Sequence, residues 1–158
     1  MPAMSGGVHE TVGRRLAEAA QRYTSGRRTL VEVLASAGRP LTVPEIVAAR
    51  PGLAQSSAYR NVTSLVELGV LRRVSGGTDD HDRFELAEAL SGHHHHLVCD
   101  RCGRVEDVEP SPQLERTLRE AARAVGASHG FTVAEHRLDV LGRCRECRAS
   151  AAPSAARR

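Results

Sequence analysis

Apolar side chains recur at helical spacing in four stretches of the first half of the chain. The stretches are Val12-Leu16-Ala19-Ala20-Tyr23, Leu30-Val33-Leu34-Ala37, Ile46-Val47 and Ala58-Val62-Leu65-Val66. Each set falls on one face of a helix, so the pattern predicts four helices. Thr42 and Pro44 suit the first turn of the third helix. Gly38 and Gly69 suit the ends of the second and fourth helices, because glycine readily takes the left-handed conformation found there.

A hairpin is predicted after the fourth helix. Residues 70–74 and 83–86 have the composition of strands, and the segment between them is rich in turn residues. A winged helix-turn-helix has this order of elements: short helices, a further helix that begins with small polar residues, and a hairpin. Thr24-Ser25-Gly26 separates the first two helices. The sequence therefore predicts a DNA-binding unit over residues 9–86.

The second half of the chain predicts a small mixed unit. Its expected elements are strands over residues 93–99 and 104–108, a helix that begins after Ser111 with Pro112 in its first turn, a loop over 126–130, and extended segments over 131–133 and 135–141. The predicted fold class is α+β, with the winged helix followed by a small α/β dimerisation unit.

The chain is expected to divide into four parts. After the DNA-binding unit come a hinge over residues 87–92, a metal-binding dimerisation unit over 93–148 and a tail over 149–158. The tail consists of Ala, Ser, Pro and Arg, so it is expected to be disordered.

Charge separates the two halves. Residues 9–75 contain ten Arg and five Glu, whereas residues 76–148 contain ten Arg and fourteen acidic residues. All basic residues of the chain are Arg. A basic half followed by an acidic half that is rich in His and Cys favours polyanion contact in the first and metal binding in the second.

Composition excludes several classes of protein. The chain has no apolar run of about 18 residues, as a membrane-spanning helix requires, and residues 1–7 have no apolar signal region. We therefore expect a cytoplasmic protein with no membrane partner. In a reducing compartment, the four Cys are expected to be metal ligands rather than disulfides.

Two thiol pairs predict a closed zinc site. Cys99 and Cys102 are separated by two residues, as are Cys144 and Cys147. A strand, a helix and a strand between the pairs would allow the second pair to fold back beside the first. Four thiolates form a tetrahedral structural Zn(II) site with no open position. Disulfides or a metal-free redox motif are the alternatives.

Four consecutive His residues precede the first thiol pair. In a strand, His94 and His96 face one way and His93 and His95 the other. Glu85 and Asp107 are candidate partners for the first two. His136 and a helix carboxylate such as Glu115 are candidates for the others. The alternative for each is a surface acid or a hydrogen-bonded His without metal.

Polar residues on the fourth helix favour DNA contact. They lie off its apolar stripe and are Gln55, Ser56, Ser57, Tyr59, Arg60, Asn61 and Ser64. Short hydroxyls suit phosphate contacts, Arg60 can bind guanine or phosphate, and Asn61 can read adenine. A solvated helix face is the alternative.

Several segments together resemble the ferric uptake regulator superfamily, the metal-responsive repressors that include zinc, iron, manganese, nickel and peroxide sensors. They are Ser57-Ala58-Tyr59-Arg60-Asn61-Val62, Arg83-Phe84-Glu85-Leu86, His93 to Cys99 with Cys102-Gly103, Ser128-His129-Gly130-Phe131, His136, and Gly142-Arg143-Cys144 with Cys147. The resemblance extends over residues 9–148, with the zinc uptake regulators as one candidate type.

The resemblance implies a homodimer that binds a palindromic operator in double-stranded DNA. It implies structural zinc on Cys99, Cys102, Cys144 and Cys147, a hinge sensor site on Glu85, His94 and His96 with Asp107 in some members, and a dimer-domain site on His93, His95, Glu115 and His136. Arg27, Tyr59 and Arg60 fall where the family contacts DNA.

Two features depart from the family pattern. Arg39-Pro40-Leu41-Thr42 holds no His where many members supply a sensor ligand, and Leu86-Ala87-Glu88 holds no Cys where zinc sensors often place one. His81 or Asp82 could take the missing place. Nitrogen and oxygen ligands leave the sensed metal open between Zn(II) and Fe(II), with Mn(II) and Ni(II) also compatible.

The expected function is a metal-responsive repressor of metal-homeostasis genes, not an enzyme. One alternative is a peroxide sensor on the same scaffold, in which bound Fe(II) drives oxidation of a ligating His. The other is a metalloenzyme with the His cluster as an open site. The sequence holds no His-Glu-x-x-His motif, which argues against the enzyme.

Overall fold

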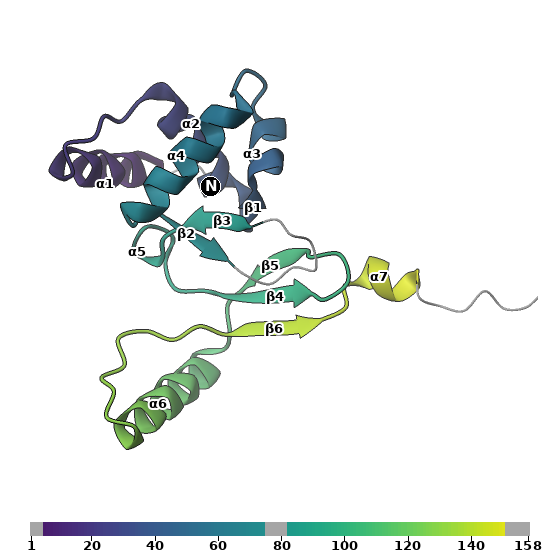
Figure 1. Cartoon of the computed structure of the whole chain (residues 1–158). Coiled ribbons are helices and arrows are strands. Elements are labelled where there is room, and N and C mark those ends of the chain that lie inside the picture. The colour runs from purple at the N-terminus through teal and green to yellow at the C-terminus, as the bar shows by residue number, and fades with distance from the viewer. Residues whose placement is uncertain (1–4, 75–81, 151–158) are drawn as a thin grey trace, which may run out of the picture.

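The computed structural model describes residues 5–74 and 82–150. In Figure 1, α1–α4 gather on one side of a small sheet, and a second sheet lies between that unit and α6. Mixed helices and strands in this order confirm the predicted α+β class. Among the described residues, no helix is long and apolar enough to cross a membrane.

The N-terminal unit has the order of a winged helix. Its elements are α1 (Ser5–Glu18), α2 (Ser25–Ala37), β1 (Leu41–Thr42), α3 (Val43–Ala49), α4 (Gln55–Glu67), β2 (Leu71–Val74) and β3 (Arg83–Leu86). The strands form an antiparallel sheet in the order β1-β3-β2. Large apolar side chains from all four helices and from the sheet form one core: Leu16, Leu30, Ile46 and Leu65 come from the helices, and Leu71 and Phe84 from the strands.

The C-terminal unit is built on a second three-stranded sheet. Its elements are α5 (Glu88–Ser91), β4 (His95–Cys99), β5 (Val105–Val108), α6 (Pro112–Ser128), β6 (Asp139–Gly142) and α7 (Arg145–Ala149). The strand order is β5-β4-β6, with β4 antiparallel to β5 and parallel to β6. Helix α5 occupies the expected hinge, and Ala149, expected in the tail, ends α7. Ser150 follows as the C-cap of α7, and residues 151–158 of the expected tail lie outside the described residues.

Local capping sets the boundaries of α2 and α3. Thr42 accepts a hydrogen bond from the backbone of Glu45, whose side chain accepts one from the backbone of Thr42. This reciprocal pair is a capping box. Gly38 ends α2 with φ of 59°, a left-handed conformation that suits glycine. The predicted start of α3 and end of α2 are therefore confirmed.

Three predicted boundaries are wrong. The first helix ends at Glu18 because Ala20 takes a left-handed conformation with φ of 53°, so Tyr23 lies outside it. Helix α6 continues through Gly126, where a loop was expected. A Cβ on Gly126 would lie 2.4 Å from Cγ2 of Val133. This glycine therefore allows the returning chain to approach, and it does not end the helix. The last strand is shorter than the alternation over 135–141 predicted.

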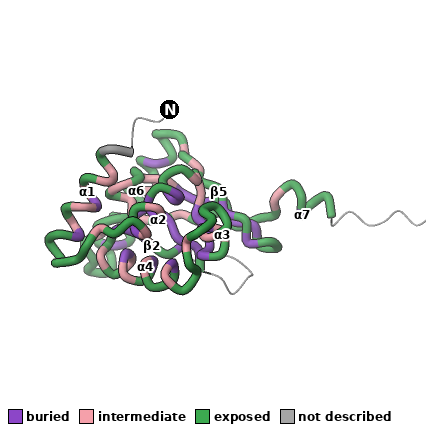
Figure 2. The backbone as a smooth tube through the Cα atoms, turned by 90° about the horizontal axis from the view of Figure 1, so that it is seen from above, coloured by how far each residue is buried: buried purple, intermediate pink, exposed green. Residues whose placement is uncertain are grey.

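The two units differ in how much apolar surface they bury. Among the described residues after Leu86, the buried apolar side chains are Val98 and Val105, together with Cys99 and Cys147. Figure 2 shows α7 standing away from the rest of the described chain, and most of its residues are exposed. So small a core is marginal without a metal or a partner.

Removing the α3 cap is expected to destabilise the N-terminal unit. Thr42→Ala should lower the free energy of unfolding by about 1 kcal/mol, because the backbone amide of Glu45 loses its acceptor. Thr117→Ala is the matched control, since this exposed hydroxyl bonds only to the carbonyl of Gln113 within α6. Urea unfolding of both variants measures the difference, and equal stability would show that the cap contributes nothing.

Candidate metal centres

His, Cys, Asp and Glu side chains converge at three places among the described residues. In each group, ligand atoms lie within 4.8 Å of one another. The four-cysteine cluster is Cys99, Cys102, Cys144 and Cys147; the hinge cluster is Glu85, His94, His96 and Asp107; the dimer-domain cluster is His93, His95, Glu115 and His136. These are the groups that the sequence predicted. His81, a further hinge candidate, lies outside the described residues.

Parallel pairing of two strands assembles the four-cysteine cluster. The register sets Cys99 opposite Gly142, so the segment after β6 returns beside the turn after β4. The Sγ atoms of Cys102 and Cys144 are 3.8 Å apart. A tetrahedron with Zn–S bonds of about 2.3 Å has edges of about 3.8 Å. All four Cys are free thiols rather than disulfides, so the donor set fits structural zinc.

The thiols differ in acidity. The backbone amide of Cys144, and those of Cys102 and Arg101, lower the pKa of Cys99 to about 6. Burial and the neighbouring thiols raise the pKa of Cys147 to about 12. Thiolates are the form that binds metal. Cys99 is thus the thiol most readily available as a first ligand, and filling the cluster must release the proton of Cys147.

The hinge cluster joins the two units. Glu85 lies on β3, His96 on β4 and Asp107 on β5, and His94 immediately precedes β4. Oε2 of Glu85 lies 3.2 Å from Nε2 of His94 and 3.2 Å from Nε2 of His96. Asp107 faces His96 across the β4–β5 pair, with Oδ1 3.9 Å from the same nitrogen. The Glu85 carboxylate, on the β2–β3 hairpin that forms the wing, thus faces two imidazoles of the C-terminal unit, and Asp107 lies behind one of them.

Other acceptors orient both hinge imidazoles. Nδ1 of His96 lies 3.0 Å from Oδ1 of Asp139 on β6, and Nδ1 of His94 lies 3.0 Å from the carbonyl oxygen of Gly92. Metal-binding His residues characteristically donate their second N–H in this way, which leaves the other nitrogen free as a ligand. Sequence reasoning missed Asp139. The parallel register that sets it opposite His96 is a tertiary feature with no local signal.

Buried charges at the hinge balance one another. Burial raises the pKa of Glu85, but hydrogen bonds from His96 and the charge of Arg72 outweigh it and hold the pKa at about 2. Burial lowers the pKa of His96, and its bonds to Glu85 and Asp139 raise it above its usual value. Glu85 is therefore ionised at neutral pH. Because the pKa of His96 is raised, a metal ion that binds this imidazole must displace its proton up to a higher pH than for an ordinary histidine.

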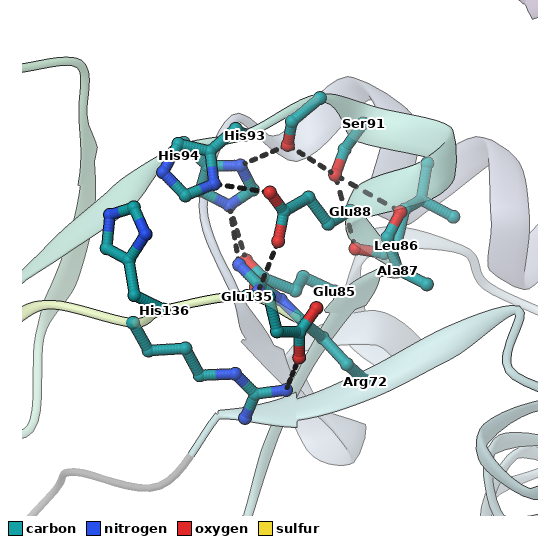
Figure 3. Close-up of polar contacts among 12 residues, drawn as sticks. Arg72, Glu85, Leu86, Ala87, Glu88, Ser91, His93, His94, Glu135 and His136 are labelled. Carbon is teal, nitrogen blue, oxygen red and sulfur yellow. Dashed lines mark hydrogen bonds and ion pairs between the residues drawn. The ribbon is translucent and has the colours of Figure 1, made fainter. Parts of the chain in front are cut away.

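Arg72 is the other residue that sequence reasoning missed. It lies opposite Glu85 across β2 and β3, donates to its carboxylate, and brings Nη2 to 3.3 Å from Nε2 of His94 (Figure 3). The β2–β3 register depends on the length of the wing turn, so the sequence alone did not pair these two residues.

Three imidazoles surround one carboxylate in the dimer-domain cluster. Glu115 lies 3.1 Å from Nε2 of His93, 2.9 Å from that of His95 and 3.4 Å from that of His136. His95 and Arg119 hydrogen-bond Glu115 and hold its pKa at about 2. Nε2 of His93 and of His136 are buried and make no hydrogen bond. Buried nitrogens aimed at a carboxylate fit a cation held among them.

The expected DNA-contacting residues lie in two different environments. Tyr59 and Arg60 are exposed on α4, and Ser57 and Asn61 are partly exposed beside them. The side chain of Arg27, which was also expected at the DNA, is buried in the free chain. Its guanidinium donates to the carbonyl of Arg22, to Gln21 and to Ser64. Arg27 therefore packs α2 against α4 and presents no free charge.

Comparisons with known proteins agree on one family. A family model described as the ferric uptake regulator family matches residues 18–141. The peroxide-responsive repressor PerR of Staphylococcus aureus is 28% identical over 136 residues, covering 84% of this chain and 86% of that protein.

Solved structures share the fold. The ferric uptake regulator of Helicobacter pylori has a TM-score of 0.71 at 20% identity, covering 91% of this chain and 93% of that one, and its structure is described as revealing three functional metal binding sites. A zinc-bound manganese uptake regulator has a TM-score of 0.60 at 25% identity, and the match covers 85% of this chain and 98% of that one.

Loss of the Asp139 carboxylate is expected to weaken metal binding at the hinge. Asp139→Ala should lower the affinity of that cluster about 10- to 100-fold, because Nδ1 of His96 loses its acceptor. Asp100→Ala is the matched control, since Asp100 is similarly exposed and lies 3.6 Å from Arg143. Competition with a calibrated chelator measures the affinity. Equal loss in both variants would contradict a specific role of Asp139.

Proposed function

Because this chain belongs to the ferric uptake regulator family, we propose that it is a metal-responsive, DNA-binding transcriptional repressor of metal-homeostasis genes. The observation that carries the proposal is the hinge cluster. Glu85 of the wing lies 3.2 Å from His94 and from His96 of the second unit. A divalent cation shared by these ligands would fix the position of the wing relative to the second sheet.

The proposed domains follow the two sheets. Residues 9–86 form the DNA-binding domain, 87–92 the hinge, and 93–148 the metal-binding dimerisation domain. The four-cysteine cluster holds structural Zn(II), which supplies the stability that the small C-terminal core lacks. The hinge cluster takes regulatory Zn(II) or Fe(II), and its nitrogen and oxygen donors are also compatible with Mn(II) and Ni(II).

The chain's own residues convert metal binding into DNA binding. Glu85 must keep its carboxylate near His94 and His96 for the wing to stay docked, and Asp139 holds the His96 ring in the orientation that permits this. Docked and undocked arrangements exchange, and a cation that binds the docked one more tightly shifts the population toward it. Binding free energies that differ by about 1–3 kcal/mol are enough for a useful switch.

A homodimer completes the proposed function. The C-terminal unit exposes large apolar side chains on α6, on β6 and between them: Leu114, Val125, Phe131, Val140 and Leu141. Apolar groups gathered on one unit favour association with a second copy. A two-fold dimer carries two α4 helices, whose exposed Tyr59 and Arg60 would meet the two halves of a palindromic operator.

A peroxide-responsive repressor is the second candidate. The 28% identity to peroxide-responsive repressors and the absence of a thiolate from the described hinge ligands favour it. In that case, peroxide with bound Fe(II) adds one oxygen atom to His94 or His96, which mass spectrometry detects. Protein that remains unmodified with Fe(II) and peroxide would exclude this candidate and leave the metal-responsive repressor intact.

The direct test is metal-dependent DNA binding. A duplex selected from a random-sequence library by the metal-loaded protein serves as the operator, and fluorescence anisotropy measures its affinity. A chelator that leaves the four-cysteine cluster loaded should weaken binding by on the order of tenfold or more. Glu85→Ala should bind weakly with or without metal, because the wing loses its ligand.

Glu106→Ala is the matched control. Glu106 lies on β5 beside Asp107, but its side chain is 52% exposed and pairs with Arg104. This variant should keep the full metal response. Equal affinity of the unmodified protein with and without chelator would contradict the switch, and failure to select any duplex would contradict DNA binding itself.

A further inference from the structure

A permanent positive charge lies inside the hinge cluster. Arg72 and Glu85 face each other across the β2–β3 pair, and Nε of Arg72 donates to Oε1 of Glu85. The Arg72 side chain is only 12% exposed. A guanidinium does not lose its proton in a protein, so this charge persists at every physiological pH.

The same guanidinium faces the lone pair of His94. Nδ1 of His94 is 3.0 Å from the carbonyl oxygen of Gly92. A carbonyl only accepts, so Nδ1 carries the proton. In the neutral ring, which is the form that binds metal, Nε2 then has its lone pair 3.3 Å from Nη2 of Arg72 and 3.2 Å from Oε2 of Glu85. Arg72 therefore engages one nitrogen and one carboxylate of the hinge cluster, and these are groups that a cation at this cluster also needs.

We propose that Arg72 is a tethered competitor that sets the metal affinity of the hinge cluster. The inference rests on the proposed sensor role of that cluster. Arg72 is a positioning residue and not a ligand, since it has no lone pair to offer. Arg72 is on Oε1 of Glu85 and the two imidazoles face Oε2. A metal ion and the guanidinium cannot both take the Nε2 lone pair of His94, and two positive charges at one carboxylate repel each other, so loading displaces the guanidinium from Nε2.

Glu88 offers the guanidinium another carboxylate. Its Oε2 lies 3.8 Å from Nη1 of Arg72, and its Oε1 accepts a hydrogen bond from Nδ1 of His93 (Figure 3). A small rotation of Arg72 toward α5 would therefore exchange Glu85 for Glu88 and keep the buried charge paired. Pairing matters here because a buried charge without a partner is costly.

Glu88 also links the hinge to the dimer-domain cluster. Nε2 of His93 is 3.1 Å from Glu115 and makes no hydrogen bond. If His93 binds a metal ion through Nε2, its Nδ1–H remains the hydrogen-bond donor to Glu88. That hydrogen bond holds the Glu88 carboxylate where Arg72 can pair with it. Loading of the dimer-domain cluster should therefore favour loading of the hinge cluster, and by linkage the reverse also holds.

The test is a titration of Co(II) into the full chain with zinc retained on the four-cysteine cluster. Glu85→Ala identifies which part of the titration belongs to the hinge cluster. Arg72→Gln should bind Co(II) there more tightly, by on the order of tenfold or more, because the competitor is gone. Arg72→Lys keeps the charge and should stay close to the unmodified protein. Arg73→Gln is the matched control, since Arg73 is 56% exposed and pairs with Asp82.

Glu88→Gln should have the opposite effect. It keeps an acceptor for His93 but removes the charge that receives Arg72, so Co(II) should bind the hinge more weakly. In the double variant Arg72→Gln/Glu88→Gln this weakening should disappear, because the two residues act as one unit. A purely structural role for either residue would not produce effects of opposite sign.

Unchanged affinity in Arg72→Gln, or equal tightening in Arg72→Gln and Arg72→Lys, overturns the proposal. Zinc content and the thermal unfolding transition establish that each variant is folded. If Arg72→Gln does not fold, Glu88→Gln decides alone, and unchanged Co(II) affinity there overturns the proposal. A titration that Glu85→Ala leaves intact contradicts the hinge sensor itself, a failure of the proposed function rather than of Arg72.

Discussion

The extended run of His93 and His94 into β4, with side chains that alternate between two faces, is the constraint on which all three metal centres depend. Successive residues of a strand point to opposite faces, so His94 and His96 meet Glu85 of the wing, while His93 and His95 meet Glu115 of α6. Cys99 ends the same strand. A shift of one residue in the pairing of β4 with its neighbours would exchange the two faces. Both His-containing clusters would then lose their carboxylates, and the returning Cys144 would no longer meet Cys99.

Charge balance is the second constraint. Glu85 and Glu115 are buried carboxylates, and each is surrounded by imidazoles and one arginine. A carboxylate buried without such partners would take up a proton rather than stay charged. The surrounding groups hold the pKa of both near 2, so the two anions are ready to bind a cation at neutral pH. At the hinge, the Arg72 guanidinium that balances Glu85 is also the group that we propose a bound cation must displace. Stability of the unloaded chain and sensitivity to metal are thus set by the same contacts.

Local signals in the sequence predicted more of the ligands than of their surroundings. The Cys spacing, the alternation of the four His residues and the Thr42 cap all operate within a few residues, and the clusters and α3 follow them. Arg72 and Asp139 were missed because each reaches its partner only through the register of two strands distant in sequence. The burial of Arg27 was not foreseen, because it depends on Gln21 and Ser64, whose packing a motif does not encode. Gly126 was taken as a helix end because its close contact with Val133 arises only after the chain returns.

Metal-dependent docking of the wing is the central claim, and hydrogen–deuterium exchange across the hinge tests it most directly. The comparison is between protein with zinc on the four-cysteine cluster alone and the same protein with the hinge cluster also loaded. The backbone amides of β3 and α5, residues 83–91, should exchange more slowly when the hinge is loaded, and Glu85→Ala should remove this protection. Identical exchange of these amides in the two states would contradict the claim that the hinge cluster joins the wing to the second sheet.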